Sequence, residues 1–198
     1  QYLKRYREEI GRRAQAIRGT TQLSVIDSRG NVAGMTVSNG EGCGSIVPNT
    51  GIMLNNMLGE EDLNVGGFHR WAEDCRMTSM MAPSLIRKPD GAVIATGSAG
   101  SNRIRTALLQ VMVNLIHCEM DVKEAVLSPR IHLEDDKLSV EGGFPSKEID
   151  RLVSHYPEHE VWTELNLFFG GAHTVSAFSG NYLGVGDPRR GGVCRVVE

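Results

Sequence analysis

The chain has 198 residues, of which 40% are hydrophobic and 23% charged, and its formal net charge is -3. These values are typical of a globular domain and favour neither a nucleic-acid partner nor a membrane surface. No run of about 18 apolar residues occurs, so we expect no membrane-spanning segment. The four cysteines are widely separated and form no Cys-x-x-Cys pair, which predicts no zinc site and leaves their redox state open.

The first predicted element is a helix over residues 2–18, where apolar side chains recur at helical spacing. Lysine and arginine dominate its charges, which favours a solvated or partner-facing helix. Strands over 20–27 and 31–38 follow, and the turn residues between them predict a hairpin. Because side chains repeat every two residues along a strand, a hydroxyl of the second strand could lie opposite Thr20.

Residues 39–82 contain a glycine-rich loop and then little periodicity, and a connection this long in a compact domain is usually functional. A hairpin over 83–96 leads through the small residues 97–102 into a helix from about Arg103 to Cys118. Small residues before a helix leave backbone N–H groups that favour an anion or a developing negative charge. An ordinary helix start is the alternative interpretation.

The rest of the chain alternates short helices and strands. The predicted elements are a helix from Asp121 to about Leu127, strands at 131–133 and 137–141, a helix from Ser146 or Lys147 to about His155, and a hairpin of 172–178 and 182–186. We therefore expect an α+β fold with mostly antiparallel sheets and no parallel βαβ winding. The six histidines show no metal-ligand spacing, and we predict neither a metal nor a cofactor.

Thr20 and Thr21 stand between the first helix and the first strand. A threonine hydroxyl becomes an effective nucleophile when a base lies beside it, and its own free α-amine can serve once the chain is cut before it. Gly19-Thr20 is therefore a candidate processing site. The opening of an ordinary strand explains the same residues, because β-branched side chains favour strands.

Six blocks of residues follow one another in a fixed order along the chain, namely 20–27, 51–56, 80–84, 96–104, 128–132 and 186–189. Together they give the sequence a resemblance to the C-terminal part of the γ-glutamyltranspeptidase family, of the N-terminal-nucleophile hydrolase class. The resemblance implies a four-layer αββα sandwich, of which this chain would supply the C-terminal half. It also implies that residues 1–19 end a large subunit and that 20–198 form the small-subunit catalytic domain.

By resemblance, the precursor cuts itself between Gly19 and Thr20, and Thr20 is then the catalytic nucleophile with its α-amine as base. Thr20 would attack a γ-glutamyl compound such as glutathione, and water or an amine would accept the acyl group from the resulting ester. Ser38 would hydrogen-bond the nucleophile, and the backbone N–H groups of Gly100 and Ser101 would form the oxyanion hole. The implied substrate-binding residues are Ser79 for the α-carboxylate, Glu60, Glu61 or Asp62 for the α-amine, and Asn39.

This sequence departs from the family pattern at a few of these positions. Gln22 stands where histidine is common, Met57 and Met80 replace polar residues, and Ser101 replaces a second glycine. Two alternatives follow. The chain could be a non-catalytic relative that serves as a structural or interaction module, or a γ-glutamyl-type amide hydrolase with a substrate other than glutathione.

The resemblance also predicts a partner, the remaining large-subunit region of the same precursor. Because Thr20 is internal in a chain that starts at Gln1, it lacks a free amine, and we predict that this piece alone is inactive. A homo-oligomer remains open. Family members are often exported, but the sequence leaves the compartment open.

Overall fold

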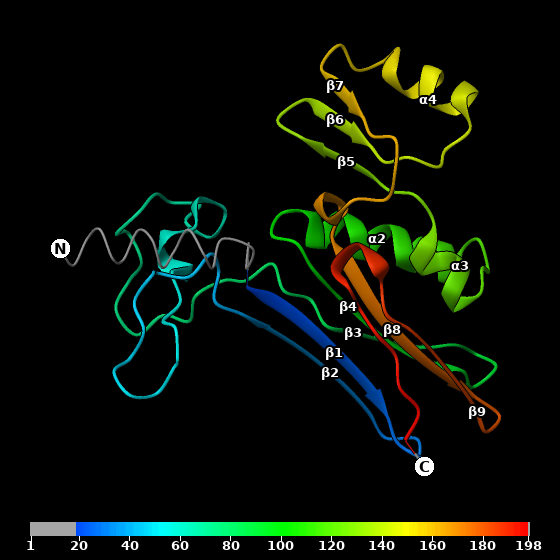
Figure 1. Ribbon diagram of the computed structural model, residues 1–198, viewed down its shortest axis with the longest axis horizontal. Helices are drawn as coiled ribbons and strands as arrows, with labels where there is room; N and C mark the ends of the chain where they lie inside the picture. Colours follow the sequence, from blue (N-terminus) through cyan, green and yellow to red (C-terminus); the bar gives the residue numbers. More distant parts are fainter. Residues whose placement is uncertain (1–18, 198) are drawn as a thin grey trace. The chain divides into compact units, whose positions relative to one another are not determined.

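The computed structural model describes residues 19–197 (Figure 1). The predicted helix over 2–18 lies outside the described residues, so the proposed large-subunit segment 1–19 stays a prediction. The chain divides into two compact units, one of Gln1–Thr20 with Ser38–Met77 and one of Thr21–Val37 with Thr78–Glu198.

The predicted first hairpin is present. Strands β1 (Thr20–Ile26) and β2 (Val32–Ser38) pair with each other as a two-stranded sheet. The Asp27 carboxylate closes the turn, because its Oδ1 accepts hydrogen bonds from the backbone N–H groups of Arg29 and Asn31 at 2.9 and 2.8 Å. An aspartate that bonds its own following backbone in this way is a common turn former.

The two faces of this hairpin have unusual polarity. Side chains alternate between faces, and the inner face carries the polar side chains of Ser24, Thr36 and Gln22, the last only 4% exposed. The outer face is apolar and open to solvent. Its large side chains are Leu23, Val25, Met35 and Val37, which are between 45% and 56% exposed.

A four-stranded antiparallel sheet forms the centre of the second unit, with strand order β3-β4-β8-β9. The strands are β3 (Ser84–Arg87), β4 (Val93–Ala99), β8 (Gly171–Phe178) and β9 (Asn181–Val185). Both predicted hairpins are confirmed. Strand β4 runs to Ala99, three residues beyond the predicted end at Thr96, because the small residues that follow Thr96 continue the pairing with β8.

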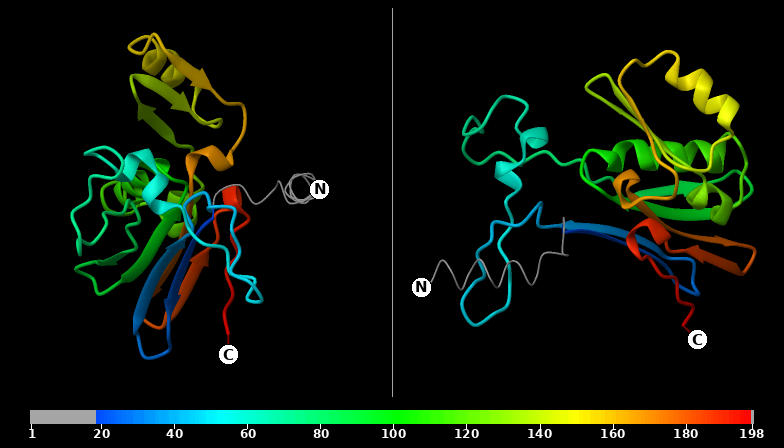
Figure 2. Two further views of the ribbon diagram at one scale, coloured as in Figure 1. Left: turned by 90° about the vertical axis from the view of Figure 1, so that its left-hand side faces the viewer. Right: turned by 45° about the horizontal axis from the view of Figure 1, so that its top comes forward.

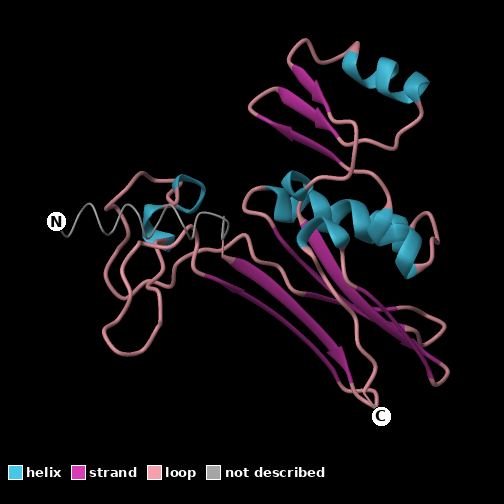
Figure 3. Ribbon diagram, viewed as in Figure 1, coloured by secondary structure: helices cyan, strands magenta, loops and turns pink. Residues whose placement is uncertain are grey.

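Helices α2 (Arg103–Ile116) and α3 (Val122–Leu127) cover one face of this sheet (Figure 3). Asp121 caps α3 as predicted, its carboxylate accepting from the Glu124 N–H at 2.8 Å. The buried apolar core joins these helices to β4 and β8. Its members are Ile94, Val111, Leu115, Val122, Ala125, Val126 and Ala172.

The β1–β2 hairpin lies on the opposite face of the sheet (Figure 2). Ser24 Oγ donates to the His173 carbonyl of β8 at 3.0 Å, and the Gln22 amide occupies the space that a side chain on Gly97 would need. Helices, sheet and hairpin thus follow one another as layers. This order is part of the predicted αββα sandwich and confirms the α+β class.

A smaller sheet contains β5 (Ile131–Glu134), β6 (Lys137–Val140) and β7 (His159–Val161). Strand β7 pairs with β6 in parallel, and α4 (Ser146–Val153) connects them. The expectation of no parallel βαβ winding was therefore wrong at this place. The sequence did not reveal β7 because this short strand is exposed along its whole length and lacks an apolar alternation.

Residues 39–77 of the first unit are mostly irregular, as predicted, and hold two 3₁₀ turns, Met57–Gly59 and Glu61–Leu63. The buried Asn64 side chain stabilises these turns through hydrogen bonds. Its Nδ2 donates to the carbonyls of Leu58 and Glu60 at 3.0 and 2.6 Å, and its Oδ1 accepts from Trp71 Nε1 at 2.9 Å. Within the described range, no helix combines the length and hydropathy that a membrane crossing needs.

Candidate functional site

Thr20 opens β1 and Ser38 ends β2, and pairing of the two strands brings their hydroxyl groups together. Thr20 Oγ1 and Ser38 Oγ are 2.8 Å apart, and Ser38 Oγ also accepts a hydrogen bond from the Gly40 N–H at 3.0 Å. Both side chains are half-buried. The hydroxyl expected opposite Thr20 is therefore that of Ser38.

Backbone hydrogen bonds fix both the N–H and the carbonyl of Gly19, the residue before Thr20. The Gly19 N–H donates to the Gly40 carbonyl at 3.1 Å, and the Gly19 carbonyl accepts from the Asn39 N–H at 3.0 Å. A donor aimed at a carbonyl oxygen stabilises the negative charge that develops there when a nucleophile attacks. The carbonyl next to Thr20 thus has one such donor in place.

Among the three acidic candidates, Glu60 is the one beside the end of β2. Its carboxylate and the Asn56 amide oxygen fill the space next to Gly40 that a side chain there would need, and Gly40 has φ +61°. The Asn56 amide oxygen also accepts from the Glu41 N–H at 2.7 Å. Glu61 and Asp62 are exposed, whereas Glu60 is half-buried.

Asn39 and Ser79 are placed differently from each other. Asn39 lies in the same unit as Thr20, and its carbonyl accepts from the Gly42 and Asn56 N–H groups at 2.9 and 3.1 Å. Ser79 belongs to the second unit, is exposed, and accepts from the Met81 N–H at 3.0 Å. In the described part of that unit, no hydrogen bond joins Ser79 to another predicted site residue.

The loop before α2 contains two consecutive residues with positive φ. Gly100 has φ +138° and Ser101 φ +55°, and a Cβ on Gly100 would come within 2.9 Å of the Gly170 Cα. Only glycine fits such a position without strain. Among the described residues, the N–H groups of Gly100 and Ser101 donate no backbone hydrogen bond, so two adjacent donors are available at the start of α2.

Gln22, which departs from the family pattern, has a structural role. Its Nε2 donates to the Leu23 carbonyl at 2.7 Å and to Ser24 Oγ at 3.0 Å, and its Oε1 accepts from Thr36 Oγ1. All of these bonds lie within the hairpin. Gln22 therefore stabilises the β1–β2 hairpin.

Sequence reasoning missed a buried cluster of four charged side chains. Arg189 bonds both oxygens of Glu141 at 2.7 Å and contacts Asp187 at 3.3 Å, and Asp187 pairs with Arg130 at 2.7 Å. Each side chain is at most 2% exposed. Burial lowers the pKa of Arg130 despite the opposing charge of Asp187, whereas for Arg189 the hydrogen bonds to Glu141 and the charge of Asp187 outweigh burial and raise the pKa.

This cluster holds the chain segment that packs against Gly100. Asp187 Oδ2 accepts from the Ala172 N–H at 2.9 Å, and Arg130 Nη1 donates to the Phe169 carbonyl at 3.1 Å. Gly170 lies between these two anchored residues. The sequence blocks 128–132 and 186–189 contain three of the four charges, but sequence alone does not show that they are buried.

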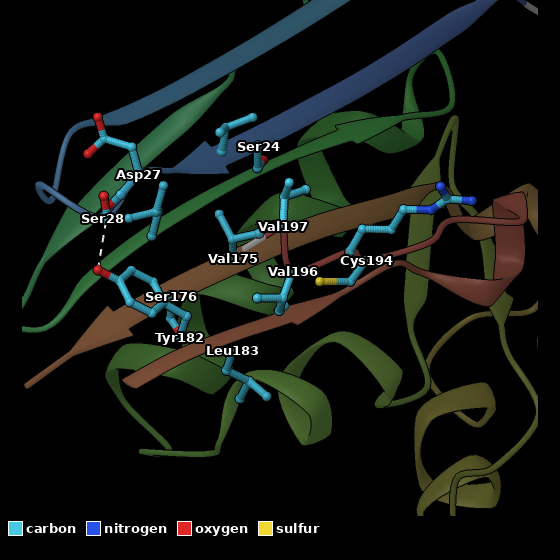
Figure 4. A pocket seen from close by; sticks show the side chains of 14 residues that line it. Ser24, Asp27, Ser28, Val175, Ser176, Tyr182, Leu183, Cys194, Val196 and Val197 are labelled. Carbon is cyan, nitrogen blue, oxygen red and sulfur yellow. Dashed lines mark hydrogen bonds between the residues drawn. The ribbon is translucent and has the colours of Figure 1, made fainter. Parts of the chain in front are cut away.

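A pocket of about 650 Å³ lies between the end of β1 and strand β9 (Figure 4). Apolar side chains such as Val175, Leu183 and Val196 line it together with Asp27, and Tyr182 Oη reaches the Asp27 carbonyl at 3.5 Å. None of the predicted site residues lines this pocket. Across residues 19–197, no three potential metal ligands gather as a metal site requires.

Comparison with known proteins adds to this geometry. The family model described as gamma-glutamyltranspeptidase matches residues 2–197. A glutathione hydrolase proenzyme of Bacillus subtilis (strain 168) is 31% identical over 178 residues, which cover 87% of this chain and 30% of that protein. The chain thus spans under a third of the length of this relative.

A second relative and a solved structure extend the comparison. The acylase ACY 1 proenzyme of Pseudomonas sp. (strain SE83) is 33% identical over 137 residues, 68% of this chain and 25% of that protein. Gamma-glutamyltranspeptidase from Pseudomonas nitroreducens, complexed with L-DON, superposes with a TM-score of 0.75 at 24% identity and covers 90% of this chain and 100% of its own. This likeness confirms the fold.

Proposed function

Because this chain belongs to the γ-glutamyltranspeptidase family, we propose that it carries the nucleophile of a γ-glutamyl transferase or hydrolase. The Thr20 hydroxyl attacks the γ-glutamyl carbonyl, the amine of the donor leaves with a proton, and a γ-glutamyl ester of Thr20 forms. Water or a second amine then takes the acyl group. The observation that carries the proposal is the 2.8 Å contact between the Thr20 and Ser38 hydroxyls at the start of β1.

The same hydroxyl is proposed to release the active amine. Thr20 Oγ1 attacks the Gly19 carbonyl carbon, the Gly19–Thr20 C–N bond breaks, and an ester forms that water cleaves to a Gly19 carboxylate and a free Thr20 amine. The Asn39 N–H, 3.0 Å from the Gly19 oxygen, stabilises the charge that develops on that oxygen. The relatives named proenzymes support such a processing step.

The other site roles are proposed by resemblance. The N–H groups of Gly100 and Ser101 receive the oxyanion of the tetrahedral intermediate, which fits their lack of backbone partners in the described chain. Glu60 binds the substrate α-amine, and Ser79 contributes to binding the α-carboxylate. A charge-assisted contact of this kind is worth about 1.5–3 kcal/mol, enough to favour a free γ-glutamyl group.

We also propose that the remaining part of the precursor is needed for activity and covers the outer face of the β1–β2 hairpin. Four large apolar side chains of that face are 45–56% exposed, and apolar faces of this kind usually meet a partner. The relative from Bacillus subtilis is more than three times as long as its matched part. The 198-residue chain on its own is accordingly expected to be inactive.

Substitution of Thr20 in the full-length precursor tests the proposal. The wild-type precursor should yield a chain whose N-terminal residue is Thr20, seen by intact mass, and should turn over a γ-glutamyl anilide. Thr20→Ala should abolish both, whereas Thr21→Ala, at the exposed neighbouring position, should retain them. Processing and turnover that survive Thr20→Ala would refute the nucleophile assignment.

The acylase relative supports a second candidate function, hydrolysis of an acyl amide other than glutathione, for which the γ-glutamyl α-amine is the group to test. A γ-glutamyl anilide and a glutaryl anilide differ only in that amine. If the first function holds, Glu60→Gln raises KM for the γ-glutamyl compound about tenfold or more and leaves the glutaryl compound unaffected. A wild-type preference for the glutaryl compound would favour the acylase function.

A further inference from the structure

A row of side-chain hydrogen bonds runs from the loop before α2 across to strand β5 and back to the helix. Asn102 Nδ2 donates to Glu134 Oε1, and Glu134 Oε2 lies 3.3 Å from His132 Nε2. On its other side, His132 Nδ1 lies 2.9 Å from Thr106 Oγ1. Because Asn102 directly follows Ser101, the row begins at the loop that presents the two open N–H groups.

The protonation states in this row follow from the partners. A carboxylate only accepts hydrogen bonds, so His132 Nε2 carries the hydrogen and, in the neutral ring, Nδ1 accepts from the Thr106 hydroxyl. Burial lowers the pKa of His132 by more than Glu134 raises it. Burial alone raises the pKa of Glu134, but its hydrogen bonds from Asn102 and His132 outweigh burial and lower it. A neutral ring thus supports a charged carboxylate.

The Asn102 side chain does not serve the helix that it precedes. An asparagine at a helix N-cap usually accepts a hydrogen bond from the first turn, which stabilises the helix by about 1 kcal/mol. Asn102 has φ -53° and ψ -30° and makes no side-chain cap bond. Its amide is directed at Glu134 on another strand instead, so the stability of α2 does not account for it.

Strand β5, which carries Glu134, is fixed by hydrogen bonds to α2 and to β6. The Gln110 side chain on α2 donates to the Ile131 carbonyl and accepts from the Ile131 N–H, both at 2.9 Å. Glu134 is three residues further along the same strand, which also pairs with β6. The loop is therefore held by Glu134 at Asn102 and packed against Gly170 at Gly100.

We propose that Glu134, supported by His132, is a positioning residue that fixes the loop and thereby the direction of the Gly100 and Ser101 N–H groups during acyl transfer. The inference rests on the proposed function. Loss of one oxyanion donor lowers kcat by a factor on the order of 10²–10³. A donor that is displaced, not removed, should lower kcat by a smaller factor. The effect falls on kcat because these donors act on the transition state, whereas ground-state substrate contacts set KM.

Three variants of the full-length precursor test the proposal, with kcat expressed per processed chain as counted by intact mass. Glu134→Ala should lower kcat for a γ-glutamyl anilide about tenfold or more and change KM less than about threefold. Glu134→Gln should recover most of the rate, because its amide oxygen still accepts from Asn102. Glu160→Ala removes an exposed partner of Lys137 in the same small sheet and should leave kcat unchanged.

The possible outcomes separate this inference from the function on which it rests. An unchanged kcat in Glu134→Ala, with turnover lost in Thr20→Ala, would overturn the positioning role alone. Equal losses in Glu134→Ala and Glu134→Gln would also overturn it, because the hydrogen bond to Asn102 would then not be the cause. Turnover that persists in Thr20→Ala would refute the proposed function and this inference with it.

Discussion

Thr20 Oγ1 and Ser38 Oγ are 2.8 Å apart, between the first residue of β1 and the last residue of β2. If Ser38 orients the nucleophile, Ser38→Ala should lower kcat on a γ-glutamyl anilide on the order of tenfold to hundredfold. Ser38→Thr keeps the hydroxyl and should restore much of the rate. Steady-state kinetics on processed protein measures both, and equal rates for Ser38→Ala and wild type would contradict the assignment.

The loop before α2 predicts opposite effects for substitutions at two adjacent positions. Ser101 has φ +55°, which costs a residue with a side chain roughly 1–2 kcal/mol. Ser101→Gly removes that strain but adds about 0.5–1 kcal/mol of chain entropy to the unfolded state, so it should be neutral or slightly stabilising. Gly100→Ala adds strain and a clash with Gly170, and should destabilise by about 1–3 kcal/mol.

Thermal unfolding of the full-length precursor measures both changes. Gly91→Ala is a suitable control for Gly100→Ala, because Gly91 has φ +92° but no atom within 4 Å of an added Cβ. The control isolates the cost of the backbone conformation. An unfolding temperature for Gly100→Ala no lower than that of Gly91→Ala would show that the contact with Gly170 is unimportant.

The sequence predicted the hairpins, the helices α2 and α3 and the loop before α2 because each depends on local signals. Turn residues at Asp27, periodic apolar side chains after Arg103 and the cap at Asp121 act over a few residues. A hydroxyl of the second strand opposite Thr20 was predicted for the same reason, since a short hairpin fixes which residues face each other. The choice of Ser38 came from the family resemblance.

The parts that could not be predicted depend on contacts between distant residues. The buried pairing of Arg130 with Asp187 joins positions 57 residues apart. From sequence alone, charged side chains such as these are expected to be exposed. Likewise, the acidic run at Glu60, Glu61 and Asp62 left the substrate-binding candidate open. Only the folded loop distinguishes the half-buried Glu60 from its exposed neighbours.

The buried charge cluster should be sensitive to loss of one partner. Asp187→Asn leaves Arg130 and Arg189 without a full counter-charge, and breaking a buried pair in this way costs about 3–5 kcal/mol. Glu160→Gln, which weakens an exposed pair with Lys137, should cost less than about 1 kcal/mol. Unfolding temperatures of the two variants should differ clearly, and similar values would contradict the importance of the cluster.

His173 should make stability depend on pH. Its Nδ1 accepts from the Asp187 N–H at 3.1 Å, which requires the neutral ring, and burial lowers its pKa below the ordinary value of 6.5. The unfolded chain therefore binds the proton more readily. The contribution of His173 is fully present above pH 6.5 and is lost as pH falls through the folded pKa.

His173→Gln should flatten this pH dependence, because glutamine can accept the same hydrogen bond without titrating. Unfolding temperatures of the full-length precursor between about pH 7 and pH 5 measure it. His155→Gln, at an exposed position, is the control. The prediction fails if His173→Gln loses as much stability with acid as the wild type.

The fit between Gln22 and Gly97 links two strands from different sheets, since the Gln22 amide occupies the space beside Gly97 where a side chain would begin. Across the family, a larger residue at position 97 should therefore be inherited only with a smaller one at position 22. This pair constrains which sequences evolution can reach near strand β1, even though neither residue is proposed to contact the substrate.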